Sequence, residues 1–222
     1  MHIDPMLLKC TCDNKKCSVF SKCCFLPTEC NCDPSGNVSI LFVGQGGGKD
    51  ERKMKRPFIG RAGTRLRQQV LYVRKTLKQH IGVAFSNTIR DNPENNRIPT
   101  QEELDSCLVF LFRDIASLMK LGLKVVIPLG NAAKLALIKT GYGSMAADRG
   151  VLYKLNNDIF GQIAVLPTYH PSYLIRNVPK FNDSNPSDLD KIVINDIIKA
   201  YNISVEDSAF DTENNAEISL DL

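Results

Sequence analysis

The sequence of 222 residues lacks a hydrophobic run approaching the roughly 20 residues that a helix needs to cross a bilayer. Residues 1–5 also lack the basic and then apolar pattern that opens a signal peptide. These two absences argue against a membrane protein. They lead us to expect a cytoplasmic protein, or a nuclear one in a eukaryotic or viral host. Histidine is scarce as well, so only His2, His80 and His170 are available to place an imidazole in a site.

Negative charge is concentrated at the C-terminal end. Residues 206–222 carry six acidic side chains and no Lys or Arg, so residues 1–205 have a formal charge of +10, against +4 for the whole chain. Such a basic body fits a polyanionic partner such as nucleic acid, and a solvated surface that keeps the protein dissolved explains the charge equally well. The acidic end has the composition of a disordered tail, which offers a contact for a protein partner.

The cysteines are unevenly distributed. Seven of the eight fall within 23 residues, and they are Cys10, Cys12, Cys17, Cys23, Cys24, Cys30 and Cys32. In a chain without a secretory signal, such clustering indicates a metal site before it indicates disulfides. Zinc and iron–sulfur clusters both bind thiolates, so composition leaves the two open.

Alternating strands and helices are predicted along the chain. Apolar runs predict four strands, at residues 38–43, 83–89, 123–129 and 163–166. Periodicity and a capping box predict helices at residues 64–79, 100–120 and 188–201, and a fourth after residue 131. This order is typical of an α/β fold, here a three-layer α/β/α sandwich with a central, mainly parallel four-stranded sheet. We expect a Cys-rich metal-binding segment (1–37), the α/β/α domain (38–204) and the acidic tail (205–222).

A glycine-rich loop follows the first predicted strand, with the sequence Gly-Gln-Gly-Gly-Gly at residues 44–48. Glycines permit turns that side chains block, and they let backbone N–H groups approach a ligand closely. In a parallel α/β sheet, ligands bind at the carboxyl ends of the strands. We therefore expect a ligand to contact Gly44, Gly46 and the one side chain of the loop, Gln45.

Several segments, taken in order, resemble the uracil-DNA glycosylase superfamily, and most closely its iron–sulfur group, usually called family 4. The glycine loop and Arg-Pro-Phe-Ile-Gly-Arg-Ala-Gly at residues 56–63 correspond to the family's first motif. Residues 86–97 and 99–107 correspond to the middle motif and its continuation, and His-Pro-Ser-Tyr-Leu at residues 170–174 matches the last motif. The resemblance extends over roughly residues 38–200, and it implies an enzyme that removes uracil from DNA.

The resemblance implies a pocket for a uracil base that has been flipped out of the DNA. Phe58 would offer a ring on which the base stacks, and the Asn87 amide would donate to and accept from the pyrimidine edge, which separates uracil from cytosine. His170 would hydrogen-bond uracil O2 and stabilise the negative charge that develops as the N-glycosidic bond breaks. Outside these motifs, the three residues would be interpreted as a core ring, a turn residue and a structural histidine.

The resemblance also implies residues that contact DNA. Leu174 corresponds to the family's wedge, which fills the gap left by the flipped base. Ser172 would contact phosphates, and Arg61 and Arg176 would supply positive charge. The implied partner is uracil-containing DNA, double- or single-stranded, bound by a monomer.

The first departure from the family's pattern lies at Gln45, where family 4 has a Glu that helps to position or activate water. An amide cannot take up a proton. The best-known uracil-excising group also has Gln there but continues with Asp, where this chain has Gly46. Dissociative cleavage would still gain from anion stabilisation by His170, and Asp50 or Glu51 are candidates to assist water. The expectation is a slower or altered glycosylase; the alternative is a catalytically weak or inactive DNA-binding or replication accessory protein of the same fold.

The second departure concerns the metal ligands. Family members bind a four-iron four-sulfur cluster through an N-terminal Cys-x-x-Cys, a Cys of the middle motif and a later Cys. The middle position is Asp91 here, the chain has no Cys-x-x-Cys, and we expect other N-terminal cysteines to replace the missing ligands. The expected ligand set is Cys12, Cys17, Cys24 (or Cys23) and Cys107. Alternatively, the N-terminal thiols bind zinc on their own and Cys107 is a buried hydrophobic residue.

Overall fold

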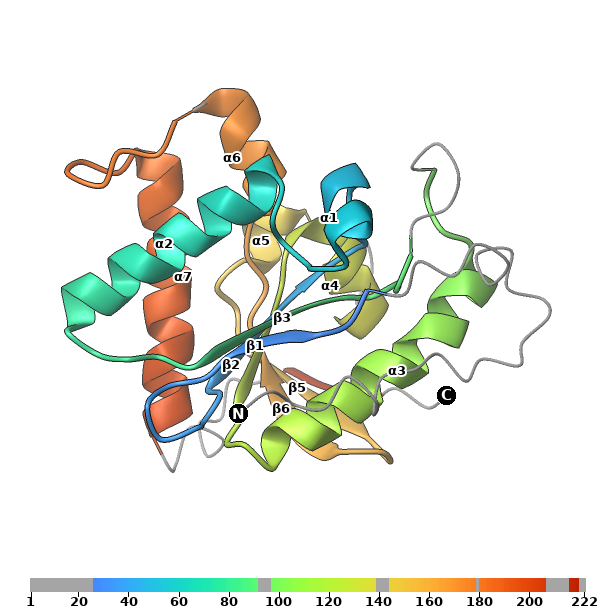
Figure 1. Ribbon diagram of the computed structural model, residues 1–222. Coiled ribbons are helices and arrows are strands. Elements are labelled where there is room, and N and C mark those ends of the chain that lie inside the picture. The colour runs from blue at the N-terminus through green and yellow to red at the C-terminus, as the bar shows by residue number, and fades with distance from the viewer. Residues whose placement is uncertain (1–25, 92–96, 139–143, 179, 207–215, 220–222) are drawn as a thin grey trace.

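A seven-stranded mixed sheet with helices on both faces forms the protein, as the computed structural model shows (Figure 1). The structure describes residues 26–91, 97–138, 144–178, 180–206 and 216–219. The strands are β1 (Glu29–Asn31), β2 (Ile40–Gly44), β3 (Val83–Asn87), β4 (Val125–Pro128), β5 (Tyr153–Asn157), β6 (Gly161–Val165) and β7 (Ala216–Ser219). The helices are α1 (Lys49–Met54), α2 (Arg61–Leu77), α3 (Gln101–Met119), α4 (Gly130–Ile138), α5 (Met145–Asp148), α6 (Pro171–Asn177) and α7 (Asp188–Val205).

The four predicted strands form the parallel centre of the sheet. They are β3, β2, β4 and β6, and each pairs in parallel with its neighbour. The predicted number of strands is wrong, because β1 adds to one edge and β5 and β7 add to the other in the order β1-β3-β2-β4-β6-β5-β7. β1 and β5 run antiparallel to the strands beside them, β3 and β6. The sheet is therefore parallel at its centre and mixed at its edges.

Two of the added strands come from segments expected to lie outside the domain. β1 belongs to the Cys-rich segment, where Cys30 pairs with Ala84 of β3. β7 lies within the acidic tail and pairs in parallel with β5. Disorder is therefore the wrong prediction for residues 216–219. The sheet also extends into the segment before residue 38, because a strand can pair through its backbone without an apolar run of its own.

The predicted three layers are confirmed. One face of the sheet packs against α3 and α4, with Leu111, Phe112 and Leu137 in that core. The other face packs against α2 and α7, with Val70 and Ile197 in that core. Figure 1 shows α2 and α7 on one side of the strands and α3 on the other. No helix in the described ranges is long and apolar enough to cross a membrane.

The register of the central strands determines which residues meet at the carboxyl edge of the sheet. β2 and β3 pair so that Gly44 lies opposite Asn87. The backbone N–H of Leu129, just after β4, donates to Val43 O at 2.8 Å, and Leu129 also bridges to Thr168 beyond β6. The segments that follow β2, β3, β4 and β6 are therefore neighbours at one edge.

Candidate active site

The absence of a side chain at Gly44 lets two other side chains meet at the end of β2. A Cβ atom at this position would lie 2.6 Å from Asn87 Oδ1 and 2.8 Å from Phe58 Cζ, both shorter than normal contacts. Asn87 and Phe58 are 4% and 6% exposed, so the three residues are closely packed at the end of β2. The structure thus brings together Gly44, Phe58 and Asn87, which are distant in sequence.

The Asn87 amide is buried and yet forms no hydrogen bond with any residue that the structure describes. Buried polar side chains are nearly always hydrogen-bonded to protein or to water. An amide with both a donor and an acceptor that no protein group uses is suited to a ligand with the complementary pair. The edge of a pyrimidine base carries such a pair.

Phe58 has a backbone conformation that few aromatic residues adopt. Its φ is +54°, in the left-handed region, and such a conformation costs on the order of 1–3 kcal/mol. Arg67 stabilises it by donating from Nε to Phe58 O at 2.9 Å and from a terminal nitrogen to Pro57 O at 3.1 Å. Gly63 is required beside it, because a Cβ there would lie 2.0 Å from the Phe58 carbonyl carbon. The ring also packs on Phe85, with centroids 5.8 Å apart, so the local structure fixes where it points.

The glycine loop is tied to β3 and to the Phe58 segment. Thr88 N–H donates to Gly44 O at 2.8 Å, and Ile89 N–H donates to Gln45 O at 2.9 Å. The Glu51 carboxylate accepts from Gly60 N–H at 2.8 Å, and it lies so close to Gly48 that a Cβ there would be 2.7 Å from it. Glu51 therefore acts on the backbone, connecting the loop with the N-terminus of α2.

Gln45 and Gly46 lie in the loop and are both partly exposed. The Gln45 side chain borders a separate hollow of about 490 Å³, which Pro99, Leu104 and Ala136 also line. Asp50, the other acidic residue considered for water activation, is exposed on α1. Within the described ranges, the hydrogen bond of Glu51 goes to Gly60 N–H, and Asp50 has none from its side chain. No hydrogen bond therefore orients either carboxylate toward Asn87.

His170 lies at the same edge of the sheet, as the N-cap of α6. Its Nδ1 accepts from Ser172 N–H at 3.1 Å, so in the neutral ring the proton is on Nε2. Burial, assisted by the positive charge of Arg176, lowers the pKa of His170 from 6.5 to about 4. The imidazole is therefore neutral at pH 7 and offers Nε2–H as a donor.

Gly130 brings His170 close to the end of β4. Its φ is +79°, and a Cβ there would lie 2.9 Å from the His170 Cβ. Gly130 N–H also donates to Thr168 O at 2.9 Å, which holds the segment before His170 against the first turn of α4. Sequence reasoning did not find Gly130, and it did not find the structural roles of Gly63 and Glu51; Glu51 was considered only as a candidate to assist water. The Gly-x-x-Gly spacing at residues 60–63 was the only sequence signal for any of these three residues, and it concerned Gly63.

Leu174, the residue expected to enter the DNA, has no exposed surface and packs in the core with α2 and α7. The predicted role of Leu174 as the wedge is wrong for this structure, because a fully buried side chain cannot fill a gap in a base stack. Its neighbour Tyr173 is 39% exposed, and its ring lies 5.1 Å from that of Tyr169. Arg61 and Arg176 are exposed as expected, and Ser172 is half-buried with its N–H bonded to His170.

Three of the four expected metal ligands, Cys12, Cys17 and Cys24, lie outside the described residues, as does Cys23. Cys107 is half-buried on α3. Cys30 and Cys32 pack against the core beneath α3, and burial raises the pKa of the Cys30 thiol to about 12. Cys30 thus behaves as a small hydrophobic residue rather than as a ready thiolate.

Asp91 occupies the position at which the family has a cluster thiolate. It is buried, and its carboxylate lies 3.9 Å from an Arg52 guanidinium nitrogen. Within the described ranges, no three His, Cys, Asp or Glu residues are grouped so that they could hold a metal ion. The described residues therefore do not by themselves fit an iron–sulfur cluster, and most of its ligands would have to come from residues 1–25.

Comparisons with known proteins agree with this geometry. The family model described as "Uracil DNA glycosylase superfamily" matches residues 32–194 of the chain. A type-4 uracil-DNA glycosylase of Thermotoga maritima is 35% identical over 167 residues, which cover 74% of this chain and 78% of the relative. Type-4 enzymes of Sulfurisphaera tokodaii and Archaeoglobus fulgidus are 32% and 28% identical, over 63% and 77% of this chain and 62% and 85% of the respective relative.

The half-buried, neutral His170 makes the stability of the fold depend on pH. In the unfolded chain the imidazole has its ordinary pKa of 6.5, whereas in the folded protein its pKa is about 4. Between these values the unfolded state binds more protons, so the free energy of unfolding falls as the pH drops below about 6.5 and continues to fall until about 4. Urea denaturation at pH 7 and pH 5 measures this loss.

The control for this prediction is His170→Asn, because Asn is a good N-cap that does not titrate. We expect this variant to lose less stability than the wild type between pH 7 and pH 5. Equal losses in the two proteins would contradict the assignment of a depressed pKa to His170.

Proposed function

The chain belongs to the uracil DNA glycosylase superfamily, and we propose that it flips uracil out of DNA and hydrolyses the bond between the base and the deoxyribose, a reaction of base excision repair. The observation that carries the proposal is the contact of Gly44 with Asn87 and Phe58 at the edge of the sheet where His170 also lies. It supports a recess for one flat base with a polar edge. The family match and the type-4 relatives support the same substrate.

Recognition of the base is assigned to Asn87, Phe58 and the loop. The Asn87 amide donates to uracil O4 and accepts from N3–H, whereas cytosine presents an amino group and a bare nitrogen at these positions. Phe58 supplies the surface on which the base stacks, a contact on the order of 1–3 kcal/mol. Gly44 has no side chain to occupy the space of the Asn87 oxygen and the Phe58 ring, and Gly46 is assigned to contact the base through its backbone. The fixed backbone of Phe58 supports this role, because a preorganised ring loses little freedom on binding.

His170 is assigned to the leaving base. As the bond between uracil N1 and deoxyribose C1′ breaks, both electrons remain on the base, and the negative charge spreads to O2. The neutral Nε2–H of His170 donates to that oxygen, and a donor of this kind contributes about 100- to 1,000-fold in rate. Water then supplies the hydroxyl group to C1′, and its proton passes to the released base or to solvent.

The described residues of the glycine loop include no base that could take a proton from the attacking water molecule. Gln45 cannot accept a proton, and Glu51 is hydrogen-bonded to Gly60 N–H. We therefore propose a reaction that depends on stabilising the leaving anion, and thus a slow enzyme. The second candidate function is that of an inactive DNA-binding protein with the same fold. The presence of Gln rather than an acidic residue at position 45 favours it.

The surface around the recess is assigned to DNA. Exposed Arg61 and Arg176 meet phosphates, and Ser172 lies between His170 and the exposed part of α6. Tyr173, with the ring of Tyr169 beside it, takes the surface position that Leu174 does not reach. The monomeric state, the cytoplasmic location and a protein partner for the acidic segment stay predictions.

Release of uracil tests the proposed function directly. The purified full-length chain is incubated with a uracil-containing oligonucleotide, and abasic sites are cleaved with alkali. We expect strand cleavage by the wild type and a loss of about 100- to 1,000-fold in His170→Ala. His80→Ala is the matched control, because His80 is exposed beyond α2 and precedes β3, at the opposite edge of the sheet. Tight DNA binding without cleavage by the wild type would favour the inactive binder.

We also propose that residues 1–25 and Cys107 hold a metal centre. A four-iron four-sulfur cluster bound by Cys12, Cys17, Cys24 and Cys107 is the first choice, and zinc bound by the N-terminal thiols is the alternative. Such a centre would connect the N-terminal segment with α3. The supporting observations are the number of cysteines in that segment and the type-4 relatives.

Metal analysis of the full chain, purified without oxygen, distinguishes the iron–sulfur cluster from zinc. We expect iron and sulfide, with broad absorbance near ~400 nm, and a loss of both in Cys107→Ala. Cys32→Ala is the control and is expected to keep its iron, since Cys32 packs against the core. A colourless protein with stoichiometric zinc would overturn the iron–sulfur assignment.

A further inference from the structure

Thr168, two residues before His170, is held by hydrogen bonds on three sides. Its backbone N–H donates to Pro128 O at 3.1 Å, and its backbone oxygen accepts from Gly130 N–H at 2.9 Å. Its side-chain hydroxyl donates to the carboxylate of Asp196 at 2.5 Å. Thr168 has no exposed surface, so this hydroxyl serves the interior of the protein alone. None of the roles assigned above uses the Thr168 hydroxyl or Asp196.

Asp196 connects the segment before His170 with α7 and with the end of α5. Its buried carboxylate also accepts from Nε of Arg149 at 3.1 Å and from a terminal nitrogen of the same guanidinium. Gly150 leaves room for the carboxylate, because a Cβ there would lie 2.9 Å from Asp196 Oδ1. The Gly150 N–H donates in turn to Pro167 O at 2.8 Å. A buried charge with these partners stays in place, since the loss of a partner is costly.

The bonds of Thr168 determine where His170 lies. Both residues lie against Gly130: Thr168 through the hydrogen bond to its N–H, and His170 so closely that a Cβ at Gly130 would lie 2.9 Å from the His170 Cβ. A shift of Thr168 relative to β4 would therefore move His170 as well. Catalysis depends strongly on such placement, because a misplacement of about 1 Å costs on the order of 100-fold in rate.

We propose that Thr168 and Asp196 are positioning residues for His170, and that the hydrogen bond between them holds the imidazole where its Nε2–H meets the leaving base. Both residues are buried, so they act through His170 rather than on the DNA. This inference rests on the proposed function, because it takes His170 to donate to uracil. The alternative is a purely structural role, in which the bond stabilises the fold without affecting the release of uracil.

Thr168→Val tests the proposal, because valine is branched like threonine but has no hydroxyl. Release of uracil is measured with enzyme in excess over the oligonucleotide, at a temperature at which circular dichroism shows every variant folded. We expect Thr168→Val to lower the rate by about 10- to 100-fold. Thr168→Ser keeps the hydroxyl and should recover a rate within about 3-fold of the wild type.

A double-mutant cycle shows whether Thr168 acts through His170. In a protein that already carries His170→Ala, Thr168→Val should change the rate by less than about 2-fold, because residues that act as a unit are not additive. A full further loss in the His170→Ala background would overturn the inference.

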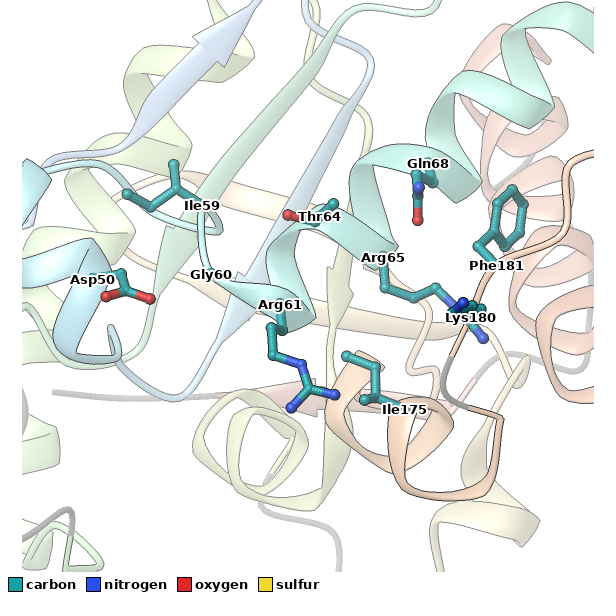
Figure 2. A pocket seen from close by; sticks show the side chains of 10 residues that line it. All are labelled: Asp50, Ile59, Gly60, Arg61, Thr64, Arg65, Gln68, Ile175, Lys180 and Phe181. Atoms are coloured by element: carbon teal, nitrogen blue, oxygen red, sulfur yellow. The ribbon is translucent and has the colours of Figure 1, made fainter.

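Ser187→Ala is the matched control. The Ser187 hydroxyl donates at 2.6 Å to Asp190, a buried acid of α7 that is paired with Arg65, one of the residues that line the surface pocket in Figure 2. This network has the same chemistry, but it connects α7 with α2 instead of with the segment before His170. Ser187→Ala also removes the N-cap of α7, so it is no milder for the fold. We expect a rate within about 2-fold of the wild type. A loss as large as that of the valine variant would contradict the proposal.

A readout without turnover separates this inference from the proposed function. NMR titration gives the pKa of the His170 imidazole, whose signal is the one that His170→Asn removes. In Thr168→Val we expect this pKa to rise from about 4 toward 6.5, because a displaced ring is less buried, whereas the nearby charge of Arg176 is unchanged. Ser187→Ala should keep the pKa of the wild type. An unchanged pKa in Thr168→Val would overturn the inference. A risen pKa in a protein that releases no uracil would instead contradict the proposed function and leave Thr168 as the residue that places His170.

Discussion

The missing side chain at Gly44 is the constraint on which the site depends. The parallel register of β2 and β3 places Gly44 opposite Asn87, and a Cβ at Gly44 would occupy the space of the Asn87 oxygen and of the Phe58 ring. Phe58 reaches that point only through a left-handed backbone, which Arg67 stabilises and Gly63 makes sterically possible. A small part of the sequence thus brings the Phe58 ring and the Asn87 amide together at the edge of a common α/β sheet, as the proposed base site requires.

Charge is separated in space across this edge of the sheet. The candidate site residues Asn87 and His170 supply a neutral amide and an imidazole whose lowered pKa keeps it neutral at pH 7. Both groups can donate hydrogen bonds. The full positive charges of Arg61 and Arg176 are exposed, on α2 and α6. In the proposed function, the exposed charges would bind the DNA backbone, and the chemistry would depend on preorganised dipoles.

The sequence predicted the central strands and the meeting of Gly44, Phe58 and Asn87 at one edge of the sheet, but not the edge strands or the surroundings of Leu174 and Glu51. The four apolar runs identified β2, β3, β4 and β6 because buried parallel strands read as continuous apolar segments. β1 has only Glu29, Cys30 and Asn31, so its pairing leaves no apolar signal. The burial of Leu174 depends on which way a seven-residue helix faces, and the hydrogen bond from Gly60 to Glu51 joins residues that lie nine positions apart in the sequence. Tertiary packing decides both.

The measurement that tests the base recess most directly compares release of uracil with release of cytosine by the wild type and by Asn87→Asp. A carboxylate cannot donate to uracil O4, but it can accept from the cytosine amino group. The wild type should therefore prefer uracil, and the substitution should reduce the ratio of the two kcat/KM values by at least about 100-fold. An unchanged ratio in Asn87→Asp would show that Asn87 does not distinguish uracil from cytosine, and it would contradict the proposed base site.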